Sequence, residues 1–131
     1  MKPISLAEDR FWKNIPDVGG VYNIHCFKGK KPITINRVLG IDNQGILYIG
    51  KSDNLRERLR MLWRVLNPNL KATAHTFGSK FNDNKKLKEA FPLNSLFIKY
   101  QVSKESKKLE KDLLDQYFQN FGEVPPFNSS K

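Results

Sequence analysis

The chain alternates short apolar runs with turn sequences between residues 21 and 50, and this pattern constrains its fold more than any other feature. The runs at residues 21–27, 33–41 and 46–50 are rich in β-branched and aromatic side chains. The turn sequences KGKKP and DNQG separate them. Such runs between turn residues are typical of strands, and short turns join antiparallel neighbours. We therefore expect a three-strand antiparallel meander here.

Helical periodicity follows this set of strands. Leucines at every third or fourth position predict a helix that runs from a cap at Ser52 or Asp53 to Leu66. Shorter helices are expected at residues 5–13, with Ser5 as the cap, and at residues 82–90.

The last third of the chain adds a strand and a long helix. Residues 96–102 alternate apolar and polar side chains, which predicts a strand. Ser103 is expected to cap a helix that runs to Asn120 and closes at Gly122. We predict a single α+β domain over residues 1–131, with a small central antiparallel β-sheet of three to four strands flanked by helices.

Charge and composition narrow the function. The 131 residues include 23 Lys and Arg against 13 Asp and Glu, a formal net charge of +10. Such an excess favours nucleic acid through counterion release, although a protein that is simply basic is the alternative. The single cysteine, Cys26, forms no internal disulfide and fits a reduced, cytoplasmic setting. No secretory signal or long apolar run is present, so no membrane partner is expected.

Arg58 differs in position from the other arginines of the leucine-rich helix. It lies three residues after Leu55 and borders the apolar stripe, whereas Arg56, Arg60 and Arg64 project away from it. An arginine stem that snorkels to solvent explains such a border position without any function. A functional role for Arg58 and a purely structural one are therefore equally compatible with its position. The other three arginines are interpreted first as part of a solvent-exposed helix face.

Glu110 lies within the apolar face of the last predicted helix. Leu109, Leu113, Leu114 and Tyr117 form that face. A carboxylate among apolar side chains is costly unless it is paired or binds a metal. We favour a metal-binding or catalytic role for Glu110 over a buried ion pair with an arginine.

Tyr48 stands just before a glycine that ends a predicted strand. Gly50 has no side-chain bulk, so a ligand or another backbone segment can come close. Lys51 follows near the start of a helix, where an anion is favoured. Taken alone, this triplet is better explained by a core aromatic residue followed by a tight turn.

Together these residues resemble the GIY-YIG nuclease family. The two half-motifs are GVY at residues 20–22, with valine in place of isoleucine, and YIG at residues 48–50. The sequence YIGKSDNLRERL is the most specific match, because it includes the arginine at position 58. Glu110 in KLEKDLL and Asn128 in PPFN match the late glutamate and asparagine of the family. The resemblance spans about residues 19–128.

The chain departs from the family pattern in two places. The two motif tyrosines are further apart in sequence than in the most compact members of the family, so the hairpin between them is enlarged. Some relatives have a further tyrosine one turn after the arginine, where this chain has Leu62 and Trp63. His75 in HTFGSKF resembles a His-x-x-Gly segment of some relatives and is a further candidate, although a lone histidine in a polar loop is more often a surface residue.

The resemblance implies a metal-dependent endonuclease that hydrolyses phosphodiester bonds in DNA. Tyr48 would be the general base, Arg58 would stabilise the phosphate, and Glu110 would bind one Mg²⁺ or Mn²⁺ ion. Tyr22 would orient the attacking water or share the proton network, and Asn128 would position the glutamate or the loop that carries it.

Further positive residues are expected to support this site. Lys51 would favour the phenolate form of Tyr48. Nucleic acid would be contacted by Lys51, Arg56, Arg60 and Lys80. A catalytically inactive nucleic-acid-binding module of the same fold and a protein-interaction domain are the alternatives. RNA as substrate, the sequence specificity, and a monomeric or transiently dimeric state stay open.

Overall fold

The computed structural model of the chain describes residues 2–66 and 84–129. Its centre is an antiparallel sheet in which β2 (Gly20–Lys28) lies between β6 (Ile46–Ser52) and β7 (Leu96–Val102). The α+β class with a central antiparallel sheet is confirmed. The predicted three-strand meander is wrong, because β2 pairs directly with β6 and residues 35–42 form a separate two-stranded sheet.

Two short strands complete the main sheet, which has five strands in all. β1 (Ile4–Ser5) pairs with β7, and β3 (Lys31–Pro32) pairs with the end of β2. The expected helix at residues 5–13 is therefore wrong. The Ser5 hydroxyl accepts a hydrogen bond from the Ala7 N–H at 3.2 Å, which favours a turn over a helix at this point. A 3₁₀ helix, η1 (Phe11–Asn14), follows.

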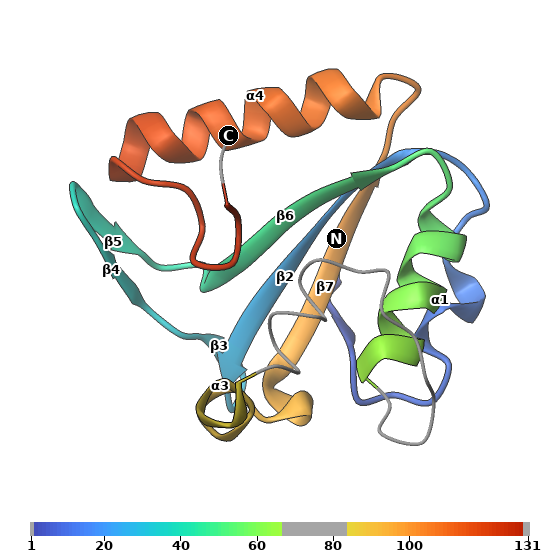
Figure 1. Cartoon of the computed structure of the whole chain (residues 1–131), viewed down its shortest axis with the longest axis horizontal. Coiled ribbons are helices and arrows are strands. Elements are labelled where there is room, and N and C mark those ends of the chain that lie inside the picture. The colour runs from blue at the N-terminus through green and yellow to red at the C-terminus, as the bar shows by residue number, and fades with distance from the viewer. Residues whose placement is uncertain (1, 67–83, 130–131) are drawn as a thin grey trace.

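Helices cover the two faces of the sheet (Figure 1). α1 (Leu55–Leu66) lies on one face, and α4 (Ser106–Phe121) crosses the other along β6. Successive residues of a strand point to opposite faces. Tyr22 therefore packs with the leucines of α1, while its neighbour Val21 packs with Leu114 and Tyr117 of α4.

The predicted strand at residues 33–41 is a separate hairpin. β4 (Ile35–Arg37) and β5 (Gly40–Asp42) pair only with each other. The Leu39 N–H donates to the Phe121 carbonyl at 3.0 Å, so the hairpin rests against the end of α4. Leu39 is 66% exposed in this hairpin.

The helix caps differ from the expected ones. Asn54, and neither Ser52 nor Asp53, caps α1, since its Oδ1 accepts from the Glu57 N–H at 3.0 Å. The Ser103 Oγ accepts from the Glu105 N–H at 3.0 Å, in the turn that precedes α4, so Ser103 is not the N-cap. The predicted closure at Gly122 is confirmed, with φ of 74°.

Two shorter helical segments precede β7. α3 (Lys85–Ala90) begins at an Asn84 cap, and η2 (Leu93–Ser95) follows it. The predicted start of this helix at residue 82 lies outside the described residues. No helix within the described ranges has the length and apolarity needed to cross a membrane.

A buried histidine makes the fold sensitive to acid. His25 is 1% exposed, and its Nδ1–H donates to the Gln44 carbonyl at 2.7 Å, while Nε2 has no hydrogen-bond partner. Burial lowers the pKa of His25 below its ordinary value. The unfolded chain therefore binds a proton at higher pH than the folded chain, and stability should fall as pH drops below about 6.5.

We expect the urea midpoint of the wild-type protein to decrease between pH 7.5 and pH 5. The variant His25→Gln should be less stable at neutral pH but should lose most of this decrease, because the titrating group is gone. Urea titrations at four pH values measure both effects. An unchanged pH dependence in His25→Gln would assign the acid sensitivity to other groups.

Candidate active site

Strands β2 and β6 bring the two motif tyrosines together. The register pairs Tyr22 with Gly50 and Ile24 with Tyr48, so both tyrosines lie on the α1 face of the sheet. Their ring centroids are 6.1 Å apart with an interplanar angle of 43°. The Tyr22 hydroxyl donates a hydrogen bond to the Tyr48 oxygen. The two half-motifs therefore form one pair of phenols.

Glycine is required in both half-motifs for steric reasons. A Cβ atom on Gly50 would lie 2.7 Å from Oη of Tyr22 and 2.7 Å from Cε2 of Tyr48. A Cβ atom on Gly20 would lie 2.2 Å from the carbonyl oxygen of Gln101 in the adjacent strand. Real Cβ atoms do not approach other atoms so closely. Gly50 thus makes room for the tyrosine pair, and Gly20 allows β2 to pair closely with β7.

The variant Gly50→Ala tests this packing. The added methyl group must displace both tyrosine rings, so we expect a loss of about 1–3 kcal/mol in the free energy of unfolding. Tyrosine fluorescence and chemical denaturation report the two effects. The matched change Gly40→Ala should cost much less, because nothing lies within 4 Å of a Cβ atom there. Equal losses in the two variants would contradict a close contact at Gly50.

Arg58 contacts both phenols of the tyrosine pair. The Asn54 carbonyl accepts from the Arg58 N–H at 3.0 Å, which fixes the residue in the first turn of α1. Its guanidinium is hydrogen-bonded to both Tyr22 and Tyr48. Arg58 is half-buried, in agreement with its predicted position at the border of the leucine stripe.

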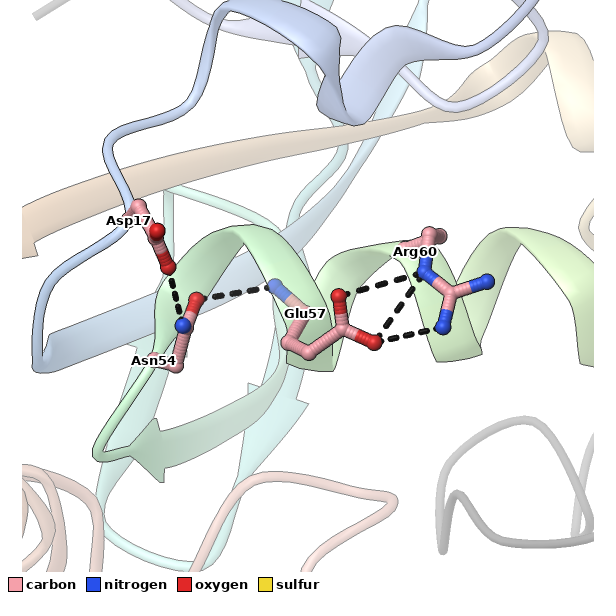
Figure 2. A network of polar contacts seen from close by, with 4 residues as sticks. All are labelled: Asp17, Asn54, Glu57 and Arg60. Atoms are coloured by element: carbon pink, nitrogen blue, oxygen red, sulfur yellow. Dashed lines mark hydrogen bonds and ion pairs between the residues drawn. The ribbon is translucent and has the colours of Figure 1, made fainter.

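The neighbouring arginines have other partners. The Arg56 Nε–H donates to the Ile15 carbonyl at 2.8 Å and so ties α1 to the segment after η1. Arg60 is exposed to solvent on one side and pairs with Glu57 one turn earlier in the same helix (Figure 2). Glu57 lies beside the Asn54 cap, which also bonds to Asp17. Both arginines, predicted as nucleic-acid contacts, therefore already have partners within the protein.

Glu110 approaches the tyrosine pair from α4. The residue is half-buried, and its charge acts electrostatically on both Tyr22 and Tyr48. Burial raises the pKa of the Glu110 carboxyl, and the positive charge of Lys51 opposes this change. The structure thus brings together four residues from four elements: β2, β6, α1 and α4.

Lys51 does not lie beside Tyr48, although the two residues are close in sequence. Tyr48 and Lys51 are an odd number of residues apart on β6, so their side chains point to opposite faces of the sheet. Arg58, and not Lys51, is the cation that lowers the pKa of Tyr48. The expectation that Lys51 favours the phenolate is therefore wrong. Its positive charge acts on Glu110.

Asn128 has a different contact from the one expected. Its Oδ1 accepts from the Ile49 N–H at 3.0 Å, and its Nδ2 donates to the Ile49 carbonyl at 2.9 Å. The Phe127 N–H also donates to the Leu47 carbonyl at 2.9 Å. The C-terminal segment thus binds the outer edge of β6. Asn128 holds the strand that carries Tyr48, and its amide is not used to position Glu110.

The two phenols differ in their readiness to ionise. Burial raises the pKa of both, and that of Tyr22 far above its ordinary value of about 10. The hydrogen bonds from Arg58 and Tyr22 oppose this increase at Tyr48. Tyr22 therefore stays a neutral donor, and Tyr48 is the phenol of the pair better placed to lose or accept a proton.

Two of the predicted site residues are not described by the structure. His75 and Lys80 fall outside the described residues. Sequence reasoning also passed over Tyr100, which the strand register places directly opposite Tyr22 on the same sheet face. The alternation that predicted this strand contained the signal, because Tyr100 shares its phase with the buried Leu96 and Ile98.

Within residues 2–66 and 84–129, no group of three or more His, Cys, Asp or Glu side chains is arranged to hold a metal ion. Cys26 is buried and free.

The fold and this cluster define a small α+β protein in which tyrosine, arginine and carboxylate side chains form a candidate site. A search of solved structures matched the GIY-YIG N-terminal endonuclease domain of UvrC from Thermotoga maritima, a Tyr-to-Phe point mutant bound to its catalytic divalent cation. The match has 20% sequence identity, covers 92% of each chain and has a TM-score of 0.45. It comes from the family that the sequence motifs resemble.

No protein-family model matches the chain. A search of curated proteins likewise found no match.

Proposed function

We propose that residues 1–131 form a metal-dependent endonuclease domain that hydrolyses phosphodiester bonds in DNA. The observation that carries this proposal is the convergence of Tyr22, Tyr48, Arg58 and Glu110 from four separate elements. A core does not need an arginine and a carboxylate beside one buried and one half-buried phenol, since burial of charge is costly. Phosphoryl chemistry needs this combination of proton acceptor, cation and metal-binding carboxylate.

Arg58 is proposed to stabilise the phosphate during cleavage. A guanidinium presents several N–H donors in one plane, and it binds phosphate oxygens in pairs. The two tyrosines hold the guanidinium through hydrogen bonds, so its direction is set before substrate binds. Because the site is half-buried, its charge is less screened than that of an arginine in open solvent.

Glu110 is proposed to bind a divalent cation. A carboxylate oxygen is the ligand that Mg²⁺ and Mn²⁺ prefer, and a single protein carboxylate suits an ion whose other ligands are phosphate oxygens and water. The raised pKa of Glu110 fits this role, because a bound cation compensates the burial of its charge. Such an ion, when bound, supplies positive charge for the phosphate and the leaving oxygen.

Tyr48 is proposed to accept the proton of the attacking water, while Tyr22 orients the Tyr48 oxygen. Since burial holds the pKa of Tyr48 above its ordinary value, only a small fraction is ionised at neutral pH. The cleavage rate is therefore expected to rise with pH through the neutral range. Asn128 supports Tyr48 indirectly by holding the edge of β6.

The substrate proposal rests on charge. A formal net charge of +10 favours a polyanion. Lys51 is exposed and close enough to act on the Glu110 charge, so it is the proposed contact for a phosphate beside the cleaved one. Arg56, Arg60 and Lys80 are proposed to add to DNA binding at longer range.

Plasmid cleavage tests the proposed function. Purified protein is incubated with supercoiled plasmid and Mg²⁺ or Mn²⁺, and the same reaction is run with EDTA. We expect nicked or linear DNA only with the cation; nicks alone indicate that one site cuts one strand. Binding without cleavage under any cation would favour the inactive binding module, and cleavage that survives EDTA would contradict a metal-dependent site.

A further inference from the structure

The hairpin formed by β4 and β5 presents an apolar tip to solvent. Val38, Leu39 and Ile41 are exposed at 73%, 66% and 55%. Val38 and Leu39 form the two-residue turn between the strands, where glycine and polar residues are the usual choice. The turn therefore does not account for these side chains. Neighbouring apolar side chains that stay exposed are typical of a surface that binds another molecule.

The tip is held in place by residues at and after the end of α4, beside which the hairpin lies (Figure 1). The Leu39 N–H donates to the Phe121 carbonyl at 3.0 Å. The Val38 N–H donates to the Glu123 carboxylate at 2.8 Å, and Arg37 pairs with the same carboxylate at 3.4 Å. These contacts fix the backbone of the tip. A partner that covers the tip therefore has little loop ordering to offset.

A hollow lies beside this tip. The cavity has a volume of about 340 Å³, and Ile41 of the hairpin is part of its wall. Its other walls come from α4 and the main sheet, and they include Ile49, Leu113, Asn120 and Phe121. One corner of the molecule thus carries an apolar projection next to a partly apolar hollow. Such a surface is self-complementary, because the projection of one copy can meet the hollow of another about a two-fold axis.

This corner is poor in charge, although the chain as a whole has a formal net charge of +10. Residues 33–50 and 116–129 contain three charged side chains, Arg37, Asp42 and Glu123. Arg37 pairs with Glu123, and both carboxylate oxygens of Asp42 accept hydrogen bonds. DNA is therefore a poor occupant, since it binds to unpaired lysines and arginines. Two copies of so basic a chain repel each other across much of their surface but not here, and interface cores are likewise depleted in charge.

We propose that the β4–β5 hairpin and the adjoining cavity form the contact between two copies of this chain, with Val38 and Leu39 of each copy against the cavity of the other. Both copies use the same surface, so the contact closes at a dimer. The apolar tip is small beside the roughly 20–30 residues that each partner contributes to a standard interface. We therefore expect a weak dimer, with a dissociation constant between about 10 µM and about 200 µM.

Sedimentation equilibrium of the purified chain, without DNA, tests the contact. From about 1 µM to about 1 mM protein, we expect the average mass to rise from that of a monomer toward that of a dimer. Association should strengthen between about 0.1 M and about 0.5 M NaCl, because salt screens the repulsion between two positive copies and leaves an apolar contact intact. A monomer at every concentration, or association that weakens with salt, would overturn the proposal.

Val38→Lys tests the projection. It places a positive charge on the exposed tip of both copies, so we expect association to weaken at least about tenfold. Val102→Lys is the matched control, because Val102 is also an exposed valine, at 50%, and it lies outside the hairpin and the cavity. This control should associate nearly as the wild-type protein does. Equal weakening in the two variants would assign the effect to added charge alone and would overturn the proposal.

Asn120→Lys tests the hollow without any change in the hairpin, so it also decides the matter if Val38→Lys does not fold. Asn120 is exposed and lines the cavity, whereas its exposed neighbour Gln119 does not line it. Asn120→Lys should weaken association about as much as Val38→Lys, and Gln119→Lys should leave it close to that of the wild-type protein. Equal association of Asn120→Lys and Gln119→Lys would overturn the proposal.

The dimer goes beyond the proposed nuclease and is measured separately from it. Two copies carry two candidate active sites, so a dimer would allow one cut in each strand of a duplex. Association without plasmid cleavage would retain the dimer contact and reject the nuclease. Plasmid cleavage by a chain that stays monomeric would retain the nuclease and reject the dimer contact.

Discussion

Replacement of Arg58 by lysine is expected to reduce the single-turnover rate of DNA cleavage by about 10²–10³-fold, the size seen when one preorganised donor to a transition-state oxyanion is removed. Lysine keeps the positive charge, so a change this large requires that the shape of the guanidinium matters. An ammonium group cannot bond to both tyrosines and still present paired donors to a phosphate. Cleavage of a labelled duplex at saturating protein concentration measures the rate.

Arg64→Lys is the matched control for this result. Arg64 lies on the same helix, one to two turns further on, and the change is chemically the same. We expect Arg64→Lys to cleave at close to the wild-type rate, and circular dichroism should show both variants folded. Similar rates in the two variants would mean that Arg58 contributes charge alone or lies outside the site.

Glu110→Gln is expected to lower metal-dependent cleavage at least about a hundredfold, since a bound cation contributes several kcal/mol to charge stabilisation. Glutamine is nearly isosteric but binds a divalent cation poorly. The fold should be retained, because burial already disfavours the charged form of Glu110. Asp112→Asn, on the exposed side of the same helix, is the control and should leave cleavage unchanged.

The raised pKa of Glu110 adds a pH dependence to this result. Protons compete with the cation for the carboxylate, and they do so at a higher pH than for an ordinary glutamate. The Mg²⁺ concentration that gives half-maximal cleavage should therefore increase as pH falls from 7.5 to 5.5. A constant half-maximal concentration over this range would show that Glu110 does not titrate against the metal.

Local patterns in the sequence were sufficient to predict the elements that carry the site. The leucine stripe of α1 and the apolar face of α4 made Arg58 and Glu110 exceptions, and both lie at the tyrosine pair in the structure. The period-2 pattern likewise predicted β7 at residues 96–102. These predictions succeeded because helical and strand periodicity depend on neighbours a few residues away.

Predictions that depended on distant contacts did less well. The pattern at residues 33–41 resembles one strand, but anchorage of Leu39 to the end of α4 folds it into a hairpin. Lys51 is near Tyr48 in sequence, yet strand alternation turns it toward Glu110. The role of Asn128 on the edge of β6 also depends on a contact between residues 79 positions apart.

The single-turnover rate of Tyr48→Phe tests the central claim most directly. This change removes one oxygen atom from the cluster and leaves the ring that packs against Tyr22. We expect wild-type cleavage to accelerate from pH 6 to pH 9 and Tyr48→Phe to be at least about a hundredfold slower throughout, the contribution of a positioned general base. Tyr117→Phe, which removes a buried phenol bonded to Asp42 on the other face, should keep the wild-type rate. Cleavage by Tyr48→Phe at the wild-type rate and with the same pH dependence would contradict an active site built on the two tyrosines.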